Sequence, residues 1–366
     1  MAVSIPIVPA AEAAPAQVRD IQHYMRPGLL QLTSLPPLAL YVHLPWCLKK
    51  CPYCDFNSHE WREVDGAGNA GTALPEARYL DALMADLEAA LPLVWGRSVH
   101  SIFIGGGTPS LFSPQSIDRQ SFNDRHLKAL GRVHDRAQAL AAVQEAASAF
   151  DTFNLDIMYA LPGQTLPELE QDMATALALA PPHISIYHLT IEPNTYFAKF
   201  PPAIPPDDDA YAMLDRITEM TGQAGLARYE ISAYHNTNYW QFGDYLGLGA
   251  GAHSKLSFAH RVVRQTRFRD PRLYMDNALA GRALAQDEDV RRADLPFEYM
   301  LNALRLREGF ALQDFVERTG LPVTAIAKAL DEAERKGLIT RDMARVRPTE
   351  RGFDFLNDLQ ALFLAD

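Results

Sequence analysis

The stretch YVHLPWCLKKCPYCDFNSHE, residues 41–60, contains all three cysteines of the 366-residue chain. Cys47, Cys51 and Cys54 stand four and three positions apart. An odd number of such closely spaced thiols is a poor disulfide framework, and a reducing cytosol would keep them free. Because thiolates are soft ligands for zinc, cuprous copper and iron–sulfur clusters, the stretch indicates a metal-binding loop.

Two metal chemistries suit these thiolates. A structural zinc site needs four ligands, and His43 or His59 would complete it. A [4Fe–4S] cluster can instead take the three cysteines on three of its irons and leave the fourth iron open to an exogenous ligand. The open iron would imply ligand exchange or chemistry, and the cysteines alone leave both interpretations standing.

The sequence on either side of the cysteines indicates alternating strands and helices. LALYVHLPWC (38–47) predicts a buried strand that runs into the cysteine loop, and a helical stretch follows at about 74–91. SVHSIFIGGGTPSLFS (98–113) predicts a second strand ending in three glycines. Such an end bares backbone N–H and C=O groups to a ligand, although a tight turn would use the same residues.

The rest of the chain extends this alternation. Strand-like runs occur at 154–165, 183–195 and 227–234, and helical stretches at 135–150 and 166–180. The pattern predicts an α/β fold with a parallel sheet or partial barrel, whose chemistry lies at the carboxyl ends of its strands.

Four parts follow from the distribution of these patterns. They are a flexible N-terminal extension at 1–37, a core domain at 38–257, a linker or helical connection at 258–295 and a small winged-helix-like α+β domain at 296–366.

Composition and charge limit the function. The chain is 48% hydrophobic and 22% charged, which is typical of a globular protein. It has no apolar run of about 18 residues and no signal-peptide pattern, so we expect a cytoplasmic protein. A net charge of −11 argues against binding of nucleic acid or of anionic membranes. The winged-helix-like tail is therefore interpreted as a docking domain.

The spacing C-x3-C-x2-C, with Tyr53 before the third cysteine, resembles the radical S-adenosylmethionine (SAM) superfamily. Within it, YVHLPWCLKKCPYCDFNSH, FIGGGTPSLFS, QSFNDRHLKALGRVHD, FNLDIMYALPGQT and GDYLGLGAGAHS look like the oxygen-independent coproporphyrinogen oxidase group and cover most of 38–257. The resemblance implies a partial (βα)6-type barrel and a [4Fe–4S] cluster on the three cysteines, with SAM at its open iron.

The same resemblance implies a set of SAM-binding residues. They are Tyr41, Gly106, Gly107, Thr108, Gln120, Arg132 and Asp156. An arginine fork suits a carboxylate, and an aspartate suits a ribose diol. Taken singly, Arg132 would be a surface charge and Asp156 a strand-end cap.

Two further features separate functions within this group. The oxidases carry another cysteine two positions after the third, where this chain has Phe56. The HemW-type heme chaperones carry H-N-x-x-Y-W, which stands here as HNTNYW (235–240). The resemblance thus implies heme binding by His235, Asn236, Tyr239 and Trp240, with the imidazole as axial ligand and the aromatic rings against the macrocycle.

The resemblance implies a heme chaperone that hands heme to a respiratory acceptor protein, with any membrane contact made through that acceptor. His188 and His253 are weaker heme candidates and are better explained as pocket residues. The rival functions are an oxygen-independent coproporphyrinogen oxidase and an impaired remnant. A homodimer stays open.

Two junctions indicate either that the barrel is shortened or that the sequence omits segments which the protein contains. About fifty positions separate the strand at 101–104 from the strand at 154–158, where the family has two further βα units. The breaks fall after Arg119 and after Tyr234. Because lost strands leave sheet edges uncovered, we expect an exposed edge and reduced stability.

Overall fold

The computed structural model describes residues 19–61, 74–107, 121–131, 136–137, 140, 143–144, 154–228 and 237–365. The chain forms two compact units. Unit 1 comprises Met1–His43, Pro75–Gly105 and Asn236–Asp366, and unit 2 comprises Leu44–Leu74 and Gly106–His235. The two units are described separately below.

A six-stranded mixed sheet forms the centre of unit 1, in the order β10-β9-β8-β7-β1-β4. Its strands are β1 (Leu38–Leu44), β4 (Val99–Gly106), β7 (Asp244–Leu248), β8 (His253–Phe258), β9 (Arg261–Arg267) and β10 (Leu284–Asp289). β1 and β7 are parallel, with Leu38 opposite Asp244. From β7 to β10 each strand is antiparallel to the next.

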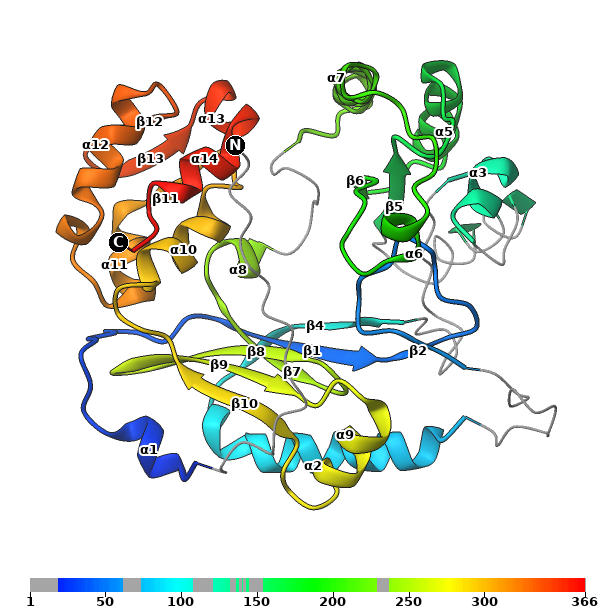
Figure 1. The fold of residues 1–366 in the computed structure, drawn as a ribbon. Helices are drawn as coiled ribbons and strands as arrows, with labels where there is room; N and C mark the ends of the chain where they lie inside the picture. Colours follow the sequence, from blue (N-terminus) through cyan, green and yellow to red (C-terminus); the bar gives the residue numbers. More distant parts are fainter. Residues whose placement is uncertain are drawn as a thin grey trace. The chain divides into compact units, whose positions relative to one another are not determined.

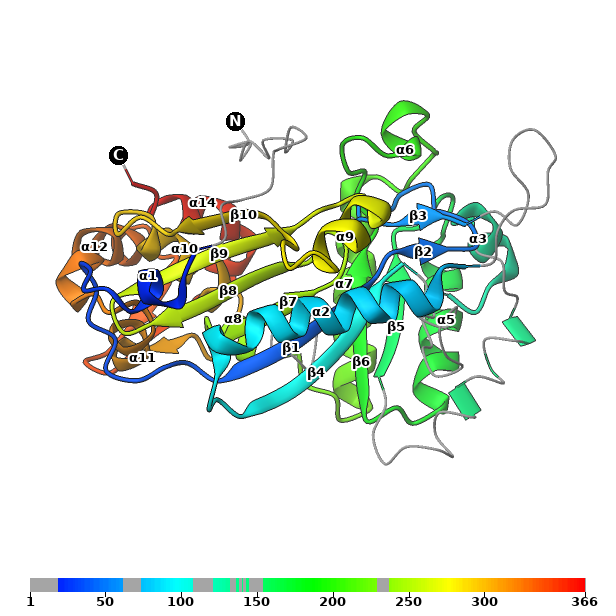
Figure 2. The ribbon, with the colours of Figure 1, turned by 90° about the horizontal axis from the view of Figure 1, so that it is seen from below.

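Two helices pack together beside this sheet, α2 (Glu76–Val94) and α9 (Pro271–Ala278), and α2 also packs against β7 (Figure 2). The buried side chains of α2 recur with helical spacing and include Tyr79, Leu83, Asp86 and Ala90. This periodicity places them on one face of the helix. The predicted strand, helix and strand around the cysteines are thus present as β1, α2 and β4.

The segment before β1 differs from the predicted flexible extension. Residues 19–37 are described, and they include a short helix, α1 (Ile21–Met25). Tyr24 stacks on Phe258 and donates a hydrogen bond to Asp287, and Leu30 is buried. Apolar side chains in the second half of the extension explain why this part packs against the sheet.

Residues 258–295, for which we expect a linker or helical connection, contain the helix α9 and the strands β9 and β10 of the sheet. In β9, which reads RVVRQTR, arginines stand at every third position and the only apolar residues are Val262 and Val263. Arg267 is itself buried against Asp86. A strand whose inward positions include a paired arginine lacks the simple apolar alternation on which the prediction depended.

The C-terminal part of unit 1 has the strand and helix order of a winged helix. Its helices are α10 (Leu295–Ala303), α11 (Leu312–Thr319), the 3-10 turn η2 (Val323–Ala325), α12 (Ala327–Arg335), α13 (Glu350–Asp354) and α14 (Leu356–Ala361). Strands β11 (Phe310–Ala311), β12 (Ile339–Arg341) and β13 (Arg345–Pro348) form an antiparallel sheet in the order β11-β13-β12. The helix α8 (Thr237–Trp240) packs against α10.

Unit 2 contains a parallel βαβ element, in which β5 (Asn154–Tyr159) pairs with β6 (His183–His188) and α5 (Leu166–Ala178) is the crossover. Figure 1 shows this pair beside α5 and α7 (Asp207–Gln223). Thr165 and Glu168 form a capping box at the start of α5. The remaining elements of unit 2 are β2 (Trp46–Cys47), β3 (His59–Glu60), α3 (Asp124–Ala129) and α6 (Tyr196–Lys199).

The strand β4 lies at the edge of the sheet, where the predicted shortening of the barrel would expose a strand. Within the described residues β4 pairs with β1 on one side and ends the sheet on the other. Ile102, Phe103 and Ile104 are 64%, 60% and 53% exposed, so both faces of the strand lack cover. Both predicted breaks, after Arg119 and after Tyr234, lie outside the described residues.

Among the helices of the described segments, none is both long and apolar enough to cross a membrane.

Candidate functional site

A short parallel ladder closes the base of the cysteine loop in unit 2. β2 pairs with β3, with Trp46 opposite His59 and Cys47 opposite Glu60. The N–H of His59 donates to the carbonyl of Pro45 at 2.7 Å, and the N–H of Trp61 donates to that of Cys47 at 2.7 Å. The ladder therefore fixes where the loop between Cys47 and His59 begins and ends.

Inside this loop none of the three cysteines forms a disulfide, and Cys47 is buried while Cys51 and Cys54 are half-buried. The N–H of Cys54 donates to the carbonyl of Cys51 at 3.1 Å, which turns the chain between them. The Lys50 ammonium donates to the carbonyl of Ser58 at 3.2 Å. These hydrogen bonds link residues within the loop. The Lys50 ammonium also adds a positive charge to the segment that carries the thiols.

The loop is docked on the rest of unit 2 through an aromatic side chain. Tyr53 packs against a buried group made of Leu130, Met158, Leu161, Leu189 and Phe197. The N–H of Phe197 also donates to the carbonyl of Pro52 at 3.0 Å. Since Leu161 and Leu189 follow β5 and β6, the cysteine loop lies against the carboxyl ends of this parallel pair, where α/β proteins place their chemistry.

The glycine-rich strand end lies beside the same loop. The N–H of Gly107 donates to the carbonyl of Leu44 at 2.6 Å. A Cβ on Gly107 would meet the Trp46 carbonyl closer than any van der Waals contact allows. The backbone at this position therefore approaches the residue next to Cys47, and only glycine permits that approach.

The other predicted SAM residues are dispersed. Tyr41 lies in unit 1, where its hydroxyl hydrogen-bonds Nδ1 of His43 at 2.8 Å and its ring stacks on Phe103. Burial raises the pKa of Tyr41 to about 12, so the phenol stays protonated. Asp156 lies in the first half of β5 and accepts from the Asn154 amide at 2.8 Å. Thr108, Gln120 and Arg132 lie outside the described residues.

The two histidines that would complete a zinc site, His43 and His59, lie within the described segments, as do the three cysteines. Among the described residues, no group of three or more His, Cys, Asp or Glu side chains is arranged to hold a metal ion. The zinc and the [4Fe–4S] interpretations of the cysteine loop both stay predictions.

The predicted heme residues lie partly outside the described structure, which omits His235 and Asn236. Tyr239 and Trp240 lie on α8 with their rings nearly perpendicular, at a centroid separation of 5.2 Å. Tyr239 also packs on Tyr245 of β7, and the guanidinium of Arg305 lies 4.4 Å from the centre of the Trp240 ring. Tyr239 is 38% exposed, so part of this aromatic pair faces solvent.

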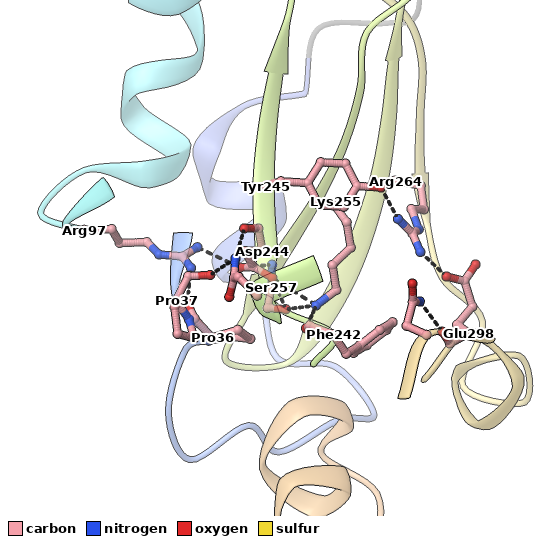
Figure 3. A network of polar contacts seen from close by, with 12 residues as sticks. Pro36, Pro37, Arg97, Phe242, Asp244, Tyr245, Lys255, Ser257, Arg264 and Glu298 are labelled. Atoms are coloured by element: carbon pink, nitrogen blue, oxygen red, sulfur yellow. Dashed lines mark hydrogen bonds and ion pairs between the residues drawn. The ribbon is translucent and has the colours of Figure 1, made fainter. Parts of the chain in front are cut away.

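A buried polar network joins the start of β7 to β8, shortly after α8 in the chain (Figure 3). Lys255 donates to Asp244 at 3.0 Å, to the carbonyl of Phe242 at 2.8 Å and to Ser257 at 3.2 Å. Arg97 forms a second ion pair with Asp244 at 2.8 Å. Complete burial lowers the pKa of Lys255 to about 8, although the negative charge of Asp244 acts to raise this pKa.

Asn238 joins the predicted heme segment to this network. Its amide donates to the carbonyls of Pro37 and Asp244, at 3.3 and 3.2 Å. These carbonyls lie at the starts of β1 and β7, so one side chain ties α8 to two parallel strands. His188 and His253, the weaker candidates, lie at the end of β6 and the start of β8, and desolvation lowers the pKa of each.

The chain was then compared with known proteins. A family model described as the HemN C-terminal domain matches residues 290–355. The heme chaperone HemW of Haemophilus influenzae is 39% identical over 395 aligned positions, which cover 92% of this chain and 100% of the relative. The chain belongs to the HemW family. The Escherichia coli heme chaperone HemW is 38% identical over 92% of this chain and 100% of its own length.

A solved structure shares the fold of this HemW family member. It is the Escherichia coli coproporphyrinogen III oxidase HemN, described as a radical SAM enzyme, with a TM-score of 0.72 and 19% identity over 90% of each chain. The predicted radical-SAM α/β fold is therefore confirmed.

The alignment with the Haemophilus HemW also bears on chain length. Its 395 positions exceed the roughly 337 residues that make up 92% of this 366-residue chain. About 58 positions, the difference between 395 and 337, therefore have no residue of this chain opposite them. This difference agrees with a shortened family member and does not locate the gaps.

Several residues that position these HemW-family segments were not predicted. Phe197 holds the cysteine loop, and Asn238, Asp244 and Lys255 hold α8. The sequence signal for Asn238 is its place inside HNTNYW, at a position that the family signature leaves open. Phe197 carries no local signal, because its partner Pro52 is far away along the chain.

Proposed function

We propose that this protein is a heme chaperone that binds a [4Fe–4S] cluster, SAM and heme, and passes heme to a respiratory acceptor protein. The observation that carries the proposal is the 39% identity to the Haemophilus influenzae heme chaperone, whose whole length aligns with this chain. The cysteine loop, the glycine-rich strand end and the HNTNYW segment add support, because each matches a motif expected of a heme chaperone of this family.

The cysteine loop supports the cluster in this proposal. Cys47, Cys51 and Cys54 would hold three irons, while Gly106 and Gly107 would leave room for SAM next to the loop. When bound, the cluster supplies an open iron at which SAM can be chelated. The chain's own contribution is to fix the base of the loop through β2 and β3, and to pack Tyr53 against unit 2.

Heme in this proposal is the cargo. His235 would be the axial ligand, since imidazole is a common ligand of heme iron, and Tyr239 and Trp240 would lie against the macrocycle with Asn236 beside them. The acceptor would dock on the C-terminal domain. A cytoplasmic protein that meets the membrane through its acceptor, and that does not bind nucleic acid, agrees with the net charge of −11.

One observation favours a second function, because the solved structure with the same fold is a coproporphyrinogen oxidase. The alternative is thus a radical-SAM enzyme that decarboxylates coproporphyrinogen. Phe56 argues against it, since the oxidases carry a cysteine at that position. It is 65% exposed here.

An anaerobic experiment distinguishes these functions. The reconstituted protein is given hemin in one sample and coproporphyrinogen with SAM and a reductant in another. We expect stoichiometric heme binding, transfer of that heme to heme-depleted respiratory membranes, and no decarboxylation. Turnover to protoporphyrinogen would refute the chaperone proposal, and absence of both activities would favour the impaired remnant.

The axial ligand has its own test. His235→Ala should weaken heme binding and move the Soret band, while the iron content of the cluster stays unchanged. An unchanged Soret spectrum would assign the axial ligand to another residue.

A further inference from the structure

The two faces of the parallel pair β5–β6 differ in character. Leu155 and Ile157 of β5 belong to a buried core that also contains side chains of α5 and α7. Because successive side chains of a strand point to opposite faces, Asn154, Asp156 and Met158 point the other way. Met158 belongs to the buried group against which the cysteine loop packs. Asp156 therefore lies on the face of β5 on which that loop is docked.

This face carries polar residues where a parallel pair usually carries apolar ones. Asn154 and Asp156 stand two positions apart on β5, and Ser185 lies directly opposite Asp156 on β6. Parallel strands are commonly covered on both faces and read as nearly continuous apolar runs. A polar group of side chains on the face of the cysteine loop therefore indicates a polar ligand rather than a hydrophobic core.

Hydrogen bonds join these three side chains. The Asn154 amide donates to Oδ1 of Asp156 at 2.8 Å and to Oγ of Ser185 at 3.0 Å. The hydroxyl of Ser185, which is buried, lies 3.2 Å from Oδ1 of Asn154 and can donate to it. The serine thus fixes the amide, and the amide fixes the carboxylate. Because an ionised carboxylate accepts about four hydrogen bonds, this contact orients Asp156 and leaves it able to accept others.

The ligand group that suits this arrangement is the ribose of SAM. Ribose presents two neighbouring hydroxyl groups, and an oriented carboxylate accepts hydrogen bonds from such a diol. We propose that Asn154, held by Ser185, positions the Asp156 carboxylate for the ribose diol of SAM. A carboxylate that is already oriented loses little freedom when the ligand binds, which raises affinity. The inference rests on the SAM binding in the proposed function and adds two positioning residues to it.

The test measures SAM binding to the reconstituted protein by anaerobic equilibrium dialysis. It compares SAM with its 2′,3′-dideoxy analogue, whose ribose lacks both hydroxyl groups. The wild-type protein should bind SAM roughly tenfold more tightly than the analogue, as expected for one charge-assisted hydrogen bond. Asn154→Ala should remove most of this preference by weakening SAM binding, and should leave binding of the analogue unchanged. Ser185→Ala should reduce the preference in the same way by roughly threefold.

Two comparisons separate positioning from packing. When Asp156→Asn is already present, Asn154→Ala should weaken SAM binding no further, because Asn154 acts through Asp156. Thr218→Ala is the matched control. Thr218 lies on α7, which packs on the opposite face of β5, and its hydroxyl donates to a carbonyl of the same helix. Its removal should leave the affinities for both ligands unchanged.

The outcomes distinguish this inference from the function on which it rests. An equal loss of SAM and analogue binding in Asn154→Ala would overturn the proposal, because it would indicate a general disturbance of the site. So would an unchanged preference for SAM in that variant, or a wild-type protein without any preference. Failure of the wild-type protein to bind either ligand would instead refute the SAM binding in the proposed function.

Discussion

The α8 segment of unit 1 is supported by buried charges, whereas the cysteine loop of unit 2 is supported by a two-residue ladder and one aromatic contact. Asp244 and Lys255 are almost completely buried and pair with each other, and Arg97 adds a second cation. Cys51 and Cys54, in contrast, are half-buried in a loop without a ladder of its own between β2 and β3. The difference teaches that contacts within the polypeptide hold α8 in place, whereas the loop leaves its thiols for the proposed cluster to organise.

Removal of the thiols should have the largest effect and should be confined to unit 2. Replacement of Cys47, Cys51 and Cys54 together by alanine should reduce reconstituted iron from about four atoms per chain to background. Amide hydrogen exchange in β7, β8 and β9 should stay as in the wild-type protein. Iron analysis and peptide-resolved mass spectrometry measure the two effects. Iron retained at stoichiometric levels would show that these cysteines do not hold the iron, and would contradict the difference drawn between the two units.

Loss of Asp244 should destabilise unit 1 strongly. Asp244→Ala leaves the buried Lys255 and the half-buried Arg97 without their acidic partner, and we expect a loss of about 3–5 kcal/mol in the free energy of unfolding. Arg291→Ala is the control, because Arg291 is exposed and solvent screens its ion pair with Asp294, so that this substitution should have little effect. Urea denaturation measures both. An equal loss of stability in the two variants would show that the buried ion pairs of Asp244 contribute no more than an exposed ion pair does.

A methyl group on Gly107 should act on the cysteine loop. Gly107→Ala forces the Cβ against the Trp46 carbonyl, and overpacking of this kind costs about 1–3 kcal/mol. We expect faster hydrogen exchange at residues 44–61 and weaker SAM binding to the reconstituted protein. Gly222→Ala in α7 serves as control, since its Cβ would meet no atom within 4 Å. That variant should be neutral or slightly more stable.

The smallest expected effect is a pH dependence of unit 2. His126 is fully buried, and burial lowers its pKa from the ordinary 6.5, with Glu168 and Arg125 as the facing charges. Because the unfolded chain then binds the proton more readily, stability should fall as pH drops below 6.5, by at most about 1.4 kcal/mol per pH unit.

His126→Gln should flatten that slope between about pH 6.5 and 5. The pKa of Glu168 is also lowered, chiefly by its hydrogen bond from the Thr165 N–H, but its contribution is lost only below the usual glutamate range. Thermal unfolding at a series of pH values measures the slope. An unchanged slope would assign the acid sensitivity to other groups.

Local patterns were sufficient to predict the elements around the cysteines. The apolar runs at 38–44, 99–106, 154–159 and 183–188 are the strands β1, β4, β5 and β6, and the crossover helix α5 lies where its periodicity indicated. Each of these elements is defined by residues adjacent in sequence, so its hydrophobic pattern can be recognised without knowledge of the tertiary structure.

The contacts that hold α8 and β9 in place could not be predicted, because they join residues that are far apart in the sequence. Arg97, Pro37 and Asp244 come from three separate segments, and no spacing in the sequence announces that Asn238 will reach two of them. β9 escaped prediction for the same reason, since Arg267 becomes an inward residue only when Asp86 of α2 is there to pair with it. When a paired charge is buried, a charged residue takes an inward position that the usual strand pattern assigns to an apolar residue.

The uncovered edge strand β4 has a consequence for production of the protein in cells. Ile102, Phe103 and Ile104 form an exposed, β-prone run, and strands with such an edge pair readily with strands of other chains. Natural sequences protect edges of this kind with a lysine that acts as a gatekeeper against aggregation. We therefore expect the yield of soluble protein, and its demand on cellular folding machinery, to depend on this strand.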